Sequence, residues 1–150
     1  MARPFRLQSV LKLRNAARDE RRKSLADALR AESIVSEQIG KLVEEIAELR
    51  SDAKAAASPG IIHVDRLLSF NRHELLLDAN RKALIGQRQK ILDEIEVRRL
   101  ALVEADRDVK ALEKLRERQE RDQQFIDDRR EQAELDQTAL MRGFSARSVP

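Results

Sequence analysis

Apolar residues recur along this chain at alternating spacings of three and four positions, and one short interruption divides the pattern in two. The repeat before the interruption includes Val35, Ile39, Leu42, Ile46 and Leu49. The repeat after it includes Leu67, Phe70, Leu77 and Leu84. Because this spacing gathers apolar side chains into one stripe along a helix, the pattern predicts two long helices of the coiled-coil type.

The interruption reads Ala57-Ser58-Pro59-Gly60-Ile61-Ile62 and predicts a turn over about residues 58–63. Proline lacks the amide hydrogen that a helix interior needs, and glycine tolerates the positive φ of a chain reversal. When the chain is folded at Pro59-Gly60, apolar positions face each other in pairs whose numbers sum to 119 or 120, such as Leu42 with Leu77. The sequence therefore predicts an all-α fold in which two long helices form an antiparallel coiled-coil hairpin.

The same pairing sets the predicted bounds of the helices. We expect one domain over residues 1–150, with helices over about residues 5–57 and 64–143 and a loose tail over residues 144–150 that follows Gly143. The first helix ends its pairing where Leu7 faces Leu112, so the second helix should overhang as a single helix. The overhanging stripe is mostly Arg and Gln, and a helix without a packing partner is only marginally stable. We therefore expect this end to be mobile or to wait for a partner.

Several positions of the seam, the line along which the two stripes meet, carry charged residues. The pairing rule sets Glu32 opposite Arg88, which is an attractive pair. It sets Arg21 opposite Arg98, which is unfavourable unless Glu94 or Glu96 intervenes. We therefore expect the hairpin to be tight near the turn and looser towards the chain termini.

Composition changes the picture mainly by exclusion. Ala, Glu, Lys, Leu and Arg make up more than half of the chain, as in long-helix proteins, and 38% of the residues are charged. There is no Cys, the two His stand ten residues apart, and no glycine-rich phosphate loop is present. A helical hairpin also offers no concave pocket that would shift the pKa of a carboxylate. We expect no enzymatic activity and no catalytic, cofactor-binding or metal-binding residue.

No apolar run approaches the length of about 18 residues that a membrane span requires, and no signal-peptide core follows Met1. The sequence therefore favours a cytoplasmic protein that does not insert directly into a membrane.

The only strongly basic zone lies at the start of the first helix, where residues 1–30 hold nine basic and three acidic side chains. Three interpretations are open: a nucleic-acid site, a solvated helix face and a protein-docking site. Nucleic-acid sites usually add aromatic stacking platforms or a denser basic field, which are missing here. Docking is favoured because Arg14, Arg18 and Arg21 occupy consecutive seam positions, where leucines would serve the hairpin better.

A second candidate surface lies close to the turn. Four apolar residues fall off the seam beside Phe70 and Leu77, namely Leu68, Leu75, Leu76 and Ile85. They make the stripe wider than one partner helix can cover. Either they broaden the core of the hairpin, or they form an apolar patch for another protein.

Two stretches of the chain resemble a known family. The opening Phe5-Arg6-Leu7-Gln8-Ser9-Val10-Leu11 resembles the F-x-L-x-x-hydrophobic-L start of the FliJ family of flagellar export stalk proteins. Residues 112–118 and 130–136, with the sequences LEKLRER and REQAELD, resemble the C-terminal half of that family. Gln137 departs from it, because an acidic residue is expected there. The length and the hairpin architecture agree over essentially the whole chain.

The resemblance implies a two-helix coiled coil similar to the central stalk, or γ subunit, of rotary ATPases. Such a protein is expected to insert its terminal end into the hexameric ring of the flagellar type III export ATPase and to promote the assembly and activity of that ring. It is also expected to contact the cytoplasmic domain of the export gate and the export chaperones. The implied location is the cytoplasmic side of the inner membrane, peripheral to it at the flagellar basal body, and the implied process is flagellum assembly for motility and chemotaxis.

The resemblance also assigns residues to these partners. Those expected to contact the ATPase are Arg14, Arg18, Arg21, Arg22, Arg116 and Arg118. Those expected to contact the gate or the chaperones are Phe70, His73, Leu76 and Leu77. Three alternatives stay open: the equivalent stalk of a virulence type III secretion system, a coiled-coil scaffold that self-associates through the seam, and a basic helical module that binds nucleic acid.

Overall fold

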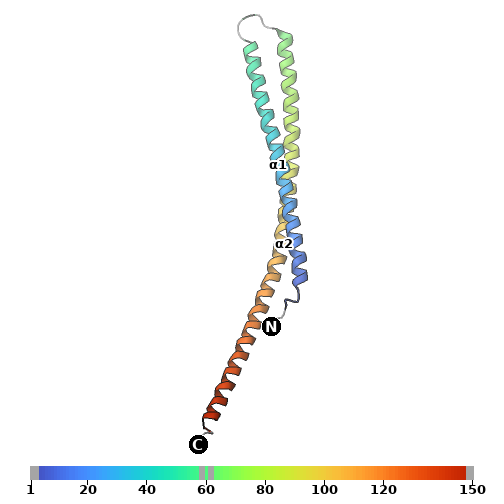
Figure 1. The fold of residues 1–150 in the computed structure, drawn as a ribbon. Coiled ribbons are helices and arrows are strands. Elements are labelled where there is room, and N and C mark those ends of the chain that lie inside the picture. Colours follow the sequence, from blue (N-terminus) through green and yellow to red (C-terminus); the bar gives the residue numbers. More distant parts are fainter. Residues whose placement is uncertain (1–3, 58–59, 61–62, 148–150) are drawn as a thin grey trace. The chain divides into compact units, whose positions relative to one another are not determined.

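The computed structural model describes residues 4–57, 60 and 63–147, and these form two α-helices, α1 (Gln8–Ala56) and α2 (Val64–Arg147) (Figure 1). No β-strand occurs among the described residues. The predicted all-α fold with two long helices is confirmed. Most of the predicted turn lies outside the described residues, because only Gly60 and His63 of that segment are described, and both are exposed and non-helical.

The helix ends differ from the prediction by a few residues. α1 begins at Gln8, after a turn at residues 6 and 7 that the Gln8 amide closes by donating to the Phe5 carbonyl at 3.1 Å. α2 begins at Val64 as predicted, with Asp65 in the first turn, where a carboxylate is favoured by the helix dipole.

The prediction that α2 ends at Gly143 is wrong. α2 continues through Gly143 to Arg147, so the first four residues of the predicted loose tail are helical. A glycine inside a helix costs only about 1 kcal/mol relative to alanine, and no described glycine has a positive φ that would mark a helix stop. The last described turn of the helix holds Arg147, a basic residue that suits the negative end of the dipole.

The contacts of the chain group into two units, and each is described by itself. We call the described residues of 19–103 the hairpin unit, and residues 4–18 with 104–147 the terminal unit. Each contains a segment of α1 and a segment of α2. The expectation of one domain over residues 1–150 stays a prediction.

The hairpin unit has its apolar core in the half that leads to the turn, where α1 and α2 run side by side in Figure 1. The buried side chains of Ile46, Leu49 and Leu77 form this core, and Leu42 and Phe70 pack against it. The cluster contains both members of two predicted pairs, Leu42 with Leu77 and Leu49 with Phe70. The predicted alignment of the two stripes is therefore confirmed here.

Polar contacts between α1 and α2 continue the same alignment along the hairpin unit. Arg50 Nε lies 2.6 Å from Glu74 Oε1, and Arg88 Nε lies 3.0 Å from Glu32 Oε1. Since the α2 numbers rise as the α1 numbers fall, the two helices are antiparallel. The pair Glu32–Arg88 was predicted at its correct positions.

The predicted clash between Arg21 and Arg98 is avoided. Arg98 Nε lies 3.0 Å from Glu94 Oε1, and Arg98 Nη1 donates to the main-chain carbonyl of Ser24 at 2.7 Å. Arg21 itself is exposed. Glu94 therefore intervenes, which is one of the two ways in which this layer was expected to be relieved.

The terminal unit places the opening of the chain against α2. Leu11 and Val109, another predicted pair, are the two most deeply buried large side chains of the described residues, at 2% and 0% exposure. The expectation that packing loosens towards the termini is wrong at this layer, because two aliphatic side chains meet there. Arg14 also reaches α2, with its Nη1 at 3.5 Å from Asp108 Oδ2.

The overhang of α2 begins where the opening segment ends. The half-buried Phe5 shares a shallow groove with α2 residues between Arg116 and Asp127, and every residue of 128–147 is exposed. In Figure 1 no other segment of the terminal unit lies beside the red end of α2. The predicted overhang as a single helix is confirmed.

Candidate protein-docking surfaces

The six arginines predicted to contact the ATPase belong to both units. Four of them lie in the terminal unit and two, Arg21 and Arg22, lie in the hairpin unit. We therefore describe them as two groups.

The terminal group lies on both helices of its unit. Arg14 is exposed despite its ion pair with Asp108, and Arg118 is exposed as well. Arg18 is half-buried, and Arg116 lines the groove that also holds Phe5, with its Nε 4.0 Å from Glu120 Oε1. Exposed ion pairs of this kind contribute about 0–1 kcal/mol, so an acidic partner could replace them at low cost.

The hairpin group lies on α1. Arg21 and Arg22 are exposed, and Arg22 Nη1 lies 3.8 Å from Asp19 Oδ1 one turn earlier. This neighbour belongs to the same helix, so the guanidinium contributes little to holding α1 against α2. Both side chains are exposed to solvent.

The four residues predicted to contact the gate or the chaperones do not share one surface. His73 and Leu76 are exposed, and Phe70 is half-buried beneath Arg66, whose guanidinium carbon lies 6.0 Å from the ring centre. Leu77 is 7% exposed and belongs to the core with Ile46 and Leu49. The interpretation of Leu77 as a docking residue therefore needs correction: its side chain faces α1, because it occupies the seam position opposite Leu42.

The apolar residues that fall off the seam near the turn do not broaden the core. Leu68, Leu75, Leu76 and Ile85 are all exposed large hydrophobic residues, and Val64 joins them at the start of α2. We call the exposed residues Val64, Leu68, His73, Leu75 and Leu76 the turn surface. Its apolar side chains stay exposed beside the core that α2 forms with α1.

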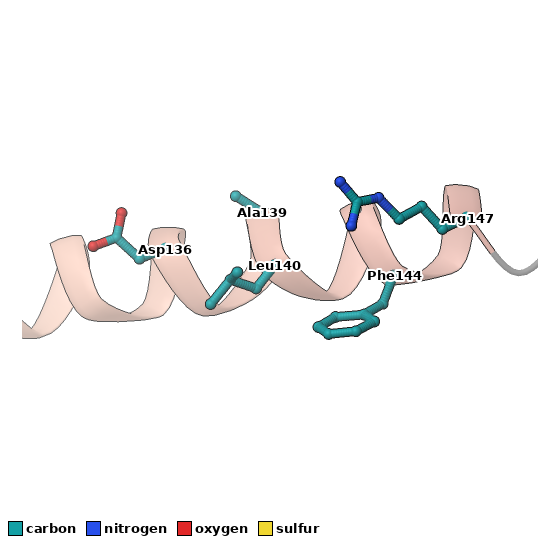
Figure 2. A pocket seen from close by; sticks show the side chains of 6 residues that line it. Asp136, Ala139, Leu140, Phe144 and Arg147 are labelled. Carbon is teal, nitrogen blue, oxygen red and sulfur yellow. The ribbon is translucent and has the colours of Figure 1, made fainter.

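The overhang that the sequence predicts carries a further exposed surface at the C-terminal end of α2. Leu140 and Phe144 stand four residues apart on one face of the helix, at 64% and 72% exposure. Figure 2 shows Leu140 and Phe144 projecting to one side of the helix, whereas Asp136, Ala139 and Arg147, which line the same hollow, project to the other side in this view. The hollow that these residues line is shallow, because a single helix forms it. We call Ile126, Ala133, Leu140 and Phe144 the C-terminal stripe.

A signal for this stripe was present in the sequence. Its four residues continue the seam of α2 in phase, since they fall at spacings of seven, seven and four. The arginines and glutamines between them dilute the apolar repeat, so that the sequence predicts only a weak packing surface. The structure shows that the apolar positions stay aligned and exposed beyond the last α1 partner.

Hydrogen bonds within α2 support the overhanging segment. Gln123 donates to Asp127 and Gln124 to Asp128, both at 3.0 Å, and Gln132 donates to Asp136 at 3.1 Å. Each such pair, four residues apart, adds about 0.2–0.5 kcal/mol to an isolated helix. The segment thus presents its stripe on a helix that is formed without a second helix beside it.

Three carboxylates of the described residues have a lowered pKa, each because of a neighbouring side chain. Hydrogen bonds from Ser36 and Arg88 lower the pKa of Glu32, and those from Lys82 and Arg99 lower the pKa of Asp78 and of Glu96. Among the described residues, no group of three His, Cys, Asp or Glu side chains is placed to hold a metal ion. Within the same residues, no helix is long and apolar enough to cross a membrane.

The whole length of both helices matches a known protein family. The family model described as flagellar FliJ protein matches residues 3–148. Searches for similar curated proteins and for similar solved structures gave no significant match.

Proposed function

The chain belongs to the FliJ family of flagellar export-associated stalk proteins, and from this premise we propose that it docks in the ring of the flagellar export ATPase and promotes the assembly and activity of that ring. The observation that carries the proposal is the extent of the family match, which covers residues 3–148 and so includes both helices. A match confined to one helical repeat would support the proposal much less, because repeats of Leu, Glu, Lys and Arg also occur in unrelated coiled coils.

The terminal unit is the end that we propose for the ATPase. It combines exposed arginines with a helical segment that extends beyond its own partner. Guanidinium groups form forked hydrogen bonds with carboxylates, so an acidic lining of the ATPase ring would complement Arg14 and Arg118. The hydrogen bonds that keep residues 123–136 helical reduce the conformational entropy lost on binding.

The turn surface is the end that we propose for the cytoplasmic domain of the export gate and for export chaperones. An exposed apolar patch on a charged helix is a typical protein-interaction surface, and Leu75 and Leu76 form its centre. In this proposal the protein acts in the cytoplasm, peripheral to the inner membrane at the flagellar basal body.

The test is ATP turnover by the export ATPase encoded with this protein. We expect the wild-type chain to stimulate turnover, and the triple variant Arg14→Glu, Arg18→Glu, Arg21→Glu to lose stimulation while keeping its helicity. A matched control is Lys41→Glu, Lys54→Glu, Lys90→Glu, which makes the same change in net charge at exposed positions of the hairpin unit. Equal stimulation by both triple variants would refute the arginine docking site, and no stimulation by the wild type would refute the ATPase role.

One observation favours a second function, self-association of the chain as a scaffold. The C-terminal stripe is apolar, helical and uncovered by the described residues of the terminal unit, so two copies could cover it. Sedimentation equilibrium of the wild type and of Leu140→Ser, Phe144→Ser distinguishes the two functions. A wild-type dimer that these substitutions dissociate would support the scaffold function. A wild-type monomer at all concentrations would exclude self-association through the stripe, which would then be available to contact the ATPase.

A further inference from the structure

The apolar part of the seam does not by itself define one alignment of α1 and α2. Apolar residues recur at intervals of seven on both helices, so sliding one helix by seven residues still pairs aliphatic side chains. Leu42 would then face Leu84 instead of Leu77, and Leu49 would face Leu77 instead of Phe70. Hydrophobic burial alone would distinguish poorly between these alignments.

The polar layer at Glu32 and Arg88 does distinguish them. Glu32 Oε1 accepts hydrogen bonds from Arg88 Nε at 3.0 Å and from Ser36 Oγ at 2.7 Å, and the Glu32 side chain is 22% exposed. In the slipped alignment just described, Glu32 would face Ile95 and Arg88 would face Ile39. Both charges would then lose their partner; this is costly mainly for the half-buried Glu32, because the Arg88 side chain is 46% exposed.

The opposite slip is disfavoured by a second contact. In that alignment Arg88 would face Leu25, although Glu32 would find Arg81 as a new partner. The slip would also move Arg98 away from the carbonyl of Ser24, to which it now donates at 2.7 Å. Each direction of sliding thus breaks a charged contact that the present alignment satisfies.

We propose that the Glu32–Arg88 layer, assisted by Arg98 on the carbonyl of Ser24, is a register lock that selects one of several heptad-related alignments of the hairpin. The lock acts on specificity more than on stability, because a leucine pair at the same layer would bury more apolar surface. One heptad corresponds to about 10.5 Å of displacement along the helix, so the lock determines which residues of α2 stand level with a given residue of α1.

Engineered disulfides test the lock, because the chain contains no cysteine of its own. Val35→Cys combined with Leu84→Cys reports the present alignment, whereas Val35→Cys combined with Ile91→Cys or with Leu77→Cys reports the two slips. In the otherwise wild-type chain we expect only the Leu84 combination to form an intramolecular disulfide under mild oxidation at low protein concentration. In the background Glu32→Leu, Arg88→Leu we expect the yield of a slipped combination to rise by about tenfold or more, as the populations of the alignments shift.

Two further backgrounds separate the lock from a general loss of charge. Glu37→Leu, Lys41→Leu removes an exposed ion pair of α1, at 3.6 Å, that takes no part in the seam, and it should leave the disulfide pattern unchanged. The swap Glu32→Arg, Arg88→Glu should restore the pattern of the wild type. If the double-leucine background Glu32→Leu, Arg88→Leu still forms only the Leu84 combination while far-ultraviolet circular dichroism shows intact helices, the lock is refuted. Slipped disulfides in the swapped background would refute it equally.

Discussion

Leu76 and Leu77 are adjacent in the sequence but have opposite environments, and this contrast gives a sharp prediction. Leu77 is 7% exposed in the core with Ile46 and Leu49, whereas Leu76 is 60% exposed on the turn surface. Replacing each by alanine removes the same atoms. We expect Leu77→Ala to destabilise the hairpin strongly and Leu76→Ala to leave its stability nearly unchanged.

The magnitude follows from the burial of each side chain. Core Leu→Ala substitutions cost about 2–5 kcal/mol, as the sum of lost transfer free energy and the cavity left behind. A two-helix seam is only one layer deep and can partly collapse, so we expect about 2–3 kcal/mol for Leu77→Ala. This corresponds to a lowering of Tm by roughly 5–10 °C for a chain of this size. Leu76→Ala should change the free energy of unfolding by less than about 0.5 kcal/mol.

Urea unfolding followed by circular dichroism at 222 nm measures the change in the free energy of unfolding for each of the two substitutions. Binding to the gate domain is measured separately, because it reports on the turn surface. Leu76→Ala should weaken that binding if the turn surface is used, even though its stability is normal. Equal destabilisation by the two substitutions would contradict the assignment of Leu77 to the seam and of Leu76 to the surface.

Three other predictions concern a carboxylate, two glycines and the C-terminal stripe. The lowered pKa of Glu32 means that it stabilises the fold above its ordinary value of 4.5 and that this contribution is lost as the pH falls through the lower value of the folded state. Glu32→Gln should therefore flatten the acid side of a stability–pH curve, and an unchanged curve would argue against the ion pair. Gly86→Ala and Gly143→Ala should each increase helicity, because an added Cβ meets open space; a loss of helicity at Gly143 would indicate a helix stop there. Leu140→Ser with Phe144→Ser should leave the Tm of the monomer within about 2 °C, since both side chains are exposed, and a larger drop would reveal an unseen contact.

The periodicity of the sequence, taken together with the turn signal at Pro59-Gly60, was sufficient to predict the alignment of the hairpin. Pairs such as Leu11 with Val109 and Glu32 with Arg88 follow from a single folding point at Pro59-Gly60, because an antiparallel seam relates all layers by one sum. Helix ends were harder to predict. Gly143 is a local signal for helix termination, but the helix continues past it. The residues that follow form main-chain hydrogen bonds, and the positive charge of Arg147 interacts favourably with the negative end of the helix dipole.

The docking surfaces were only partly predictable, because exposure depends on which face of a helix a neighbouring residue occupies. Leu76 and Leu77 are chemically identical in the sequence, and the heptad position decides that one is buried. The seam phase of the sequence reaches the C-terminal stripe, but the stripe was interpreted as weak because arginines and glutamines separate its apolar residues.

The overhanging segment of α2 has a consequence for how the molecule responds to heating. Its amide protons are protected only by hydrogen bonds within one helix, so hydrogen exchange there should be faster than at Leu49 or Leu77, where opening requires separation of two helices. Residues 128–147 should also unwind progressively from the C-terminal end before the hairpin melts cooperatively. A thermal melt at 222 nm would then show a sloping baseline ahead of the main transition, and a site-specific protease would cut α2 between these residues while the hairpin is still folded.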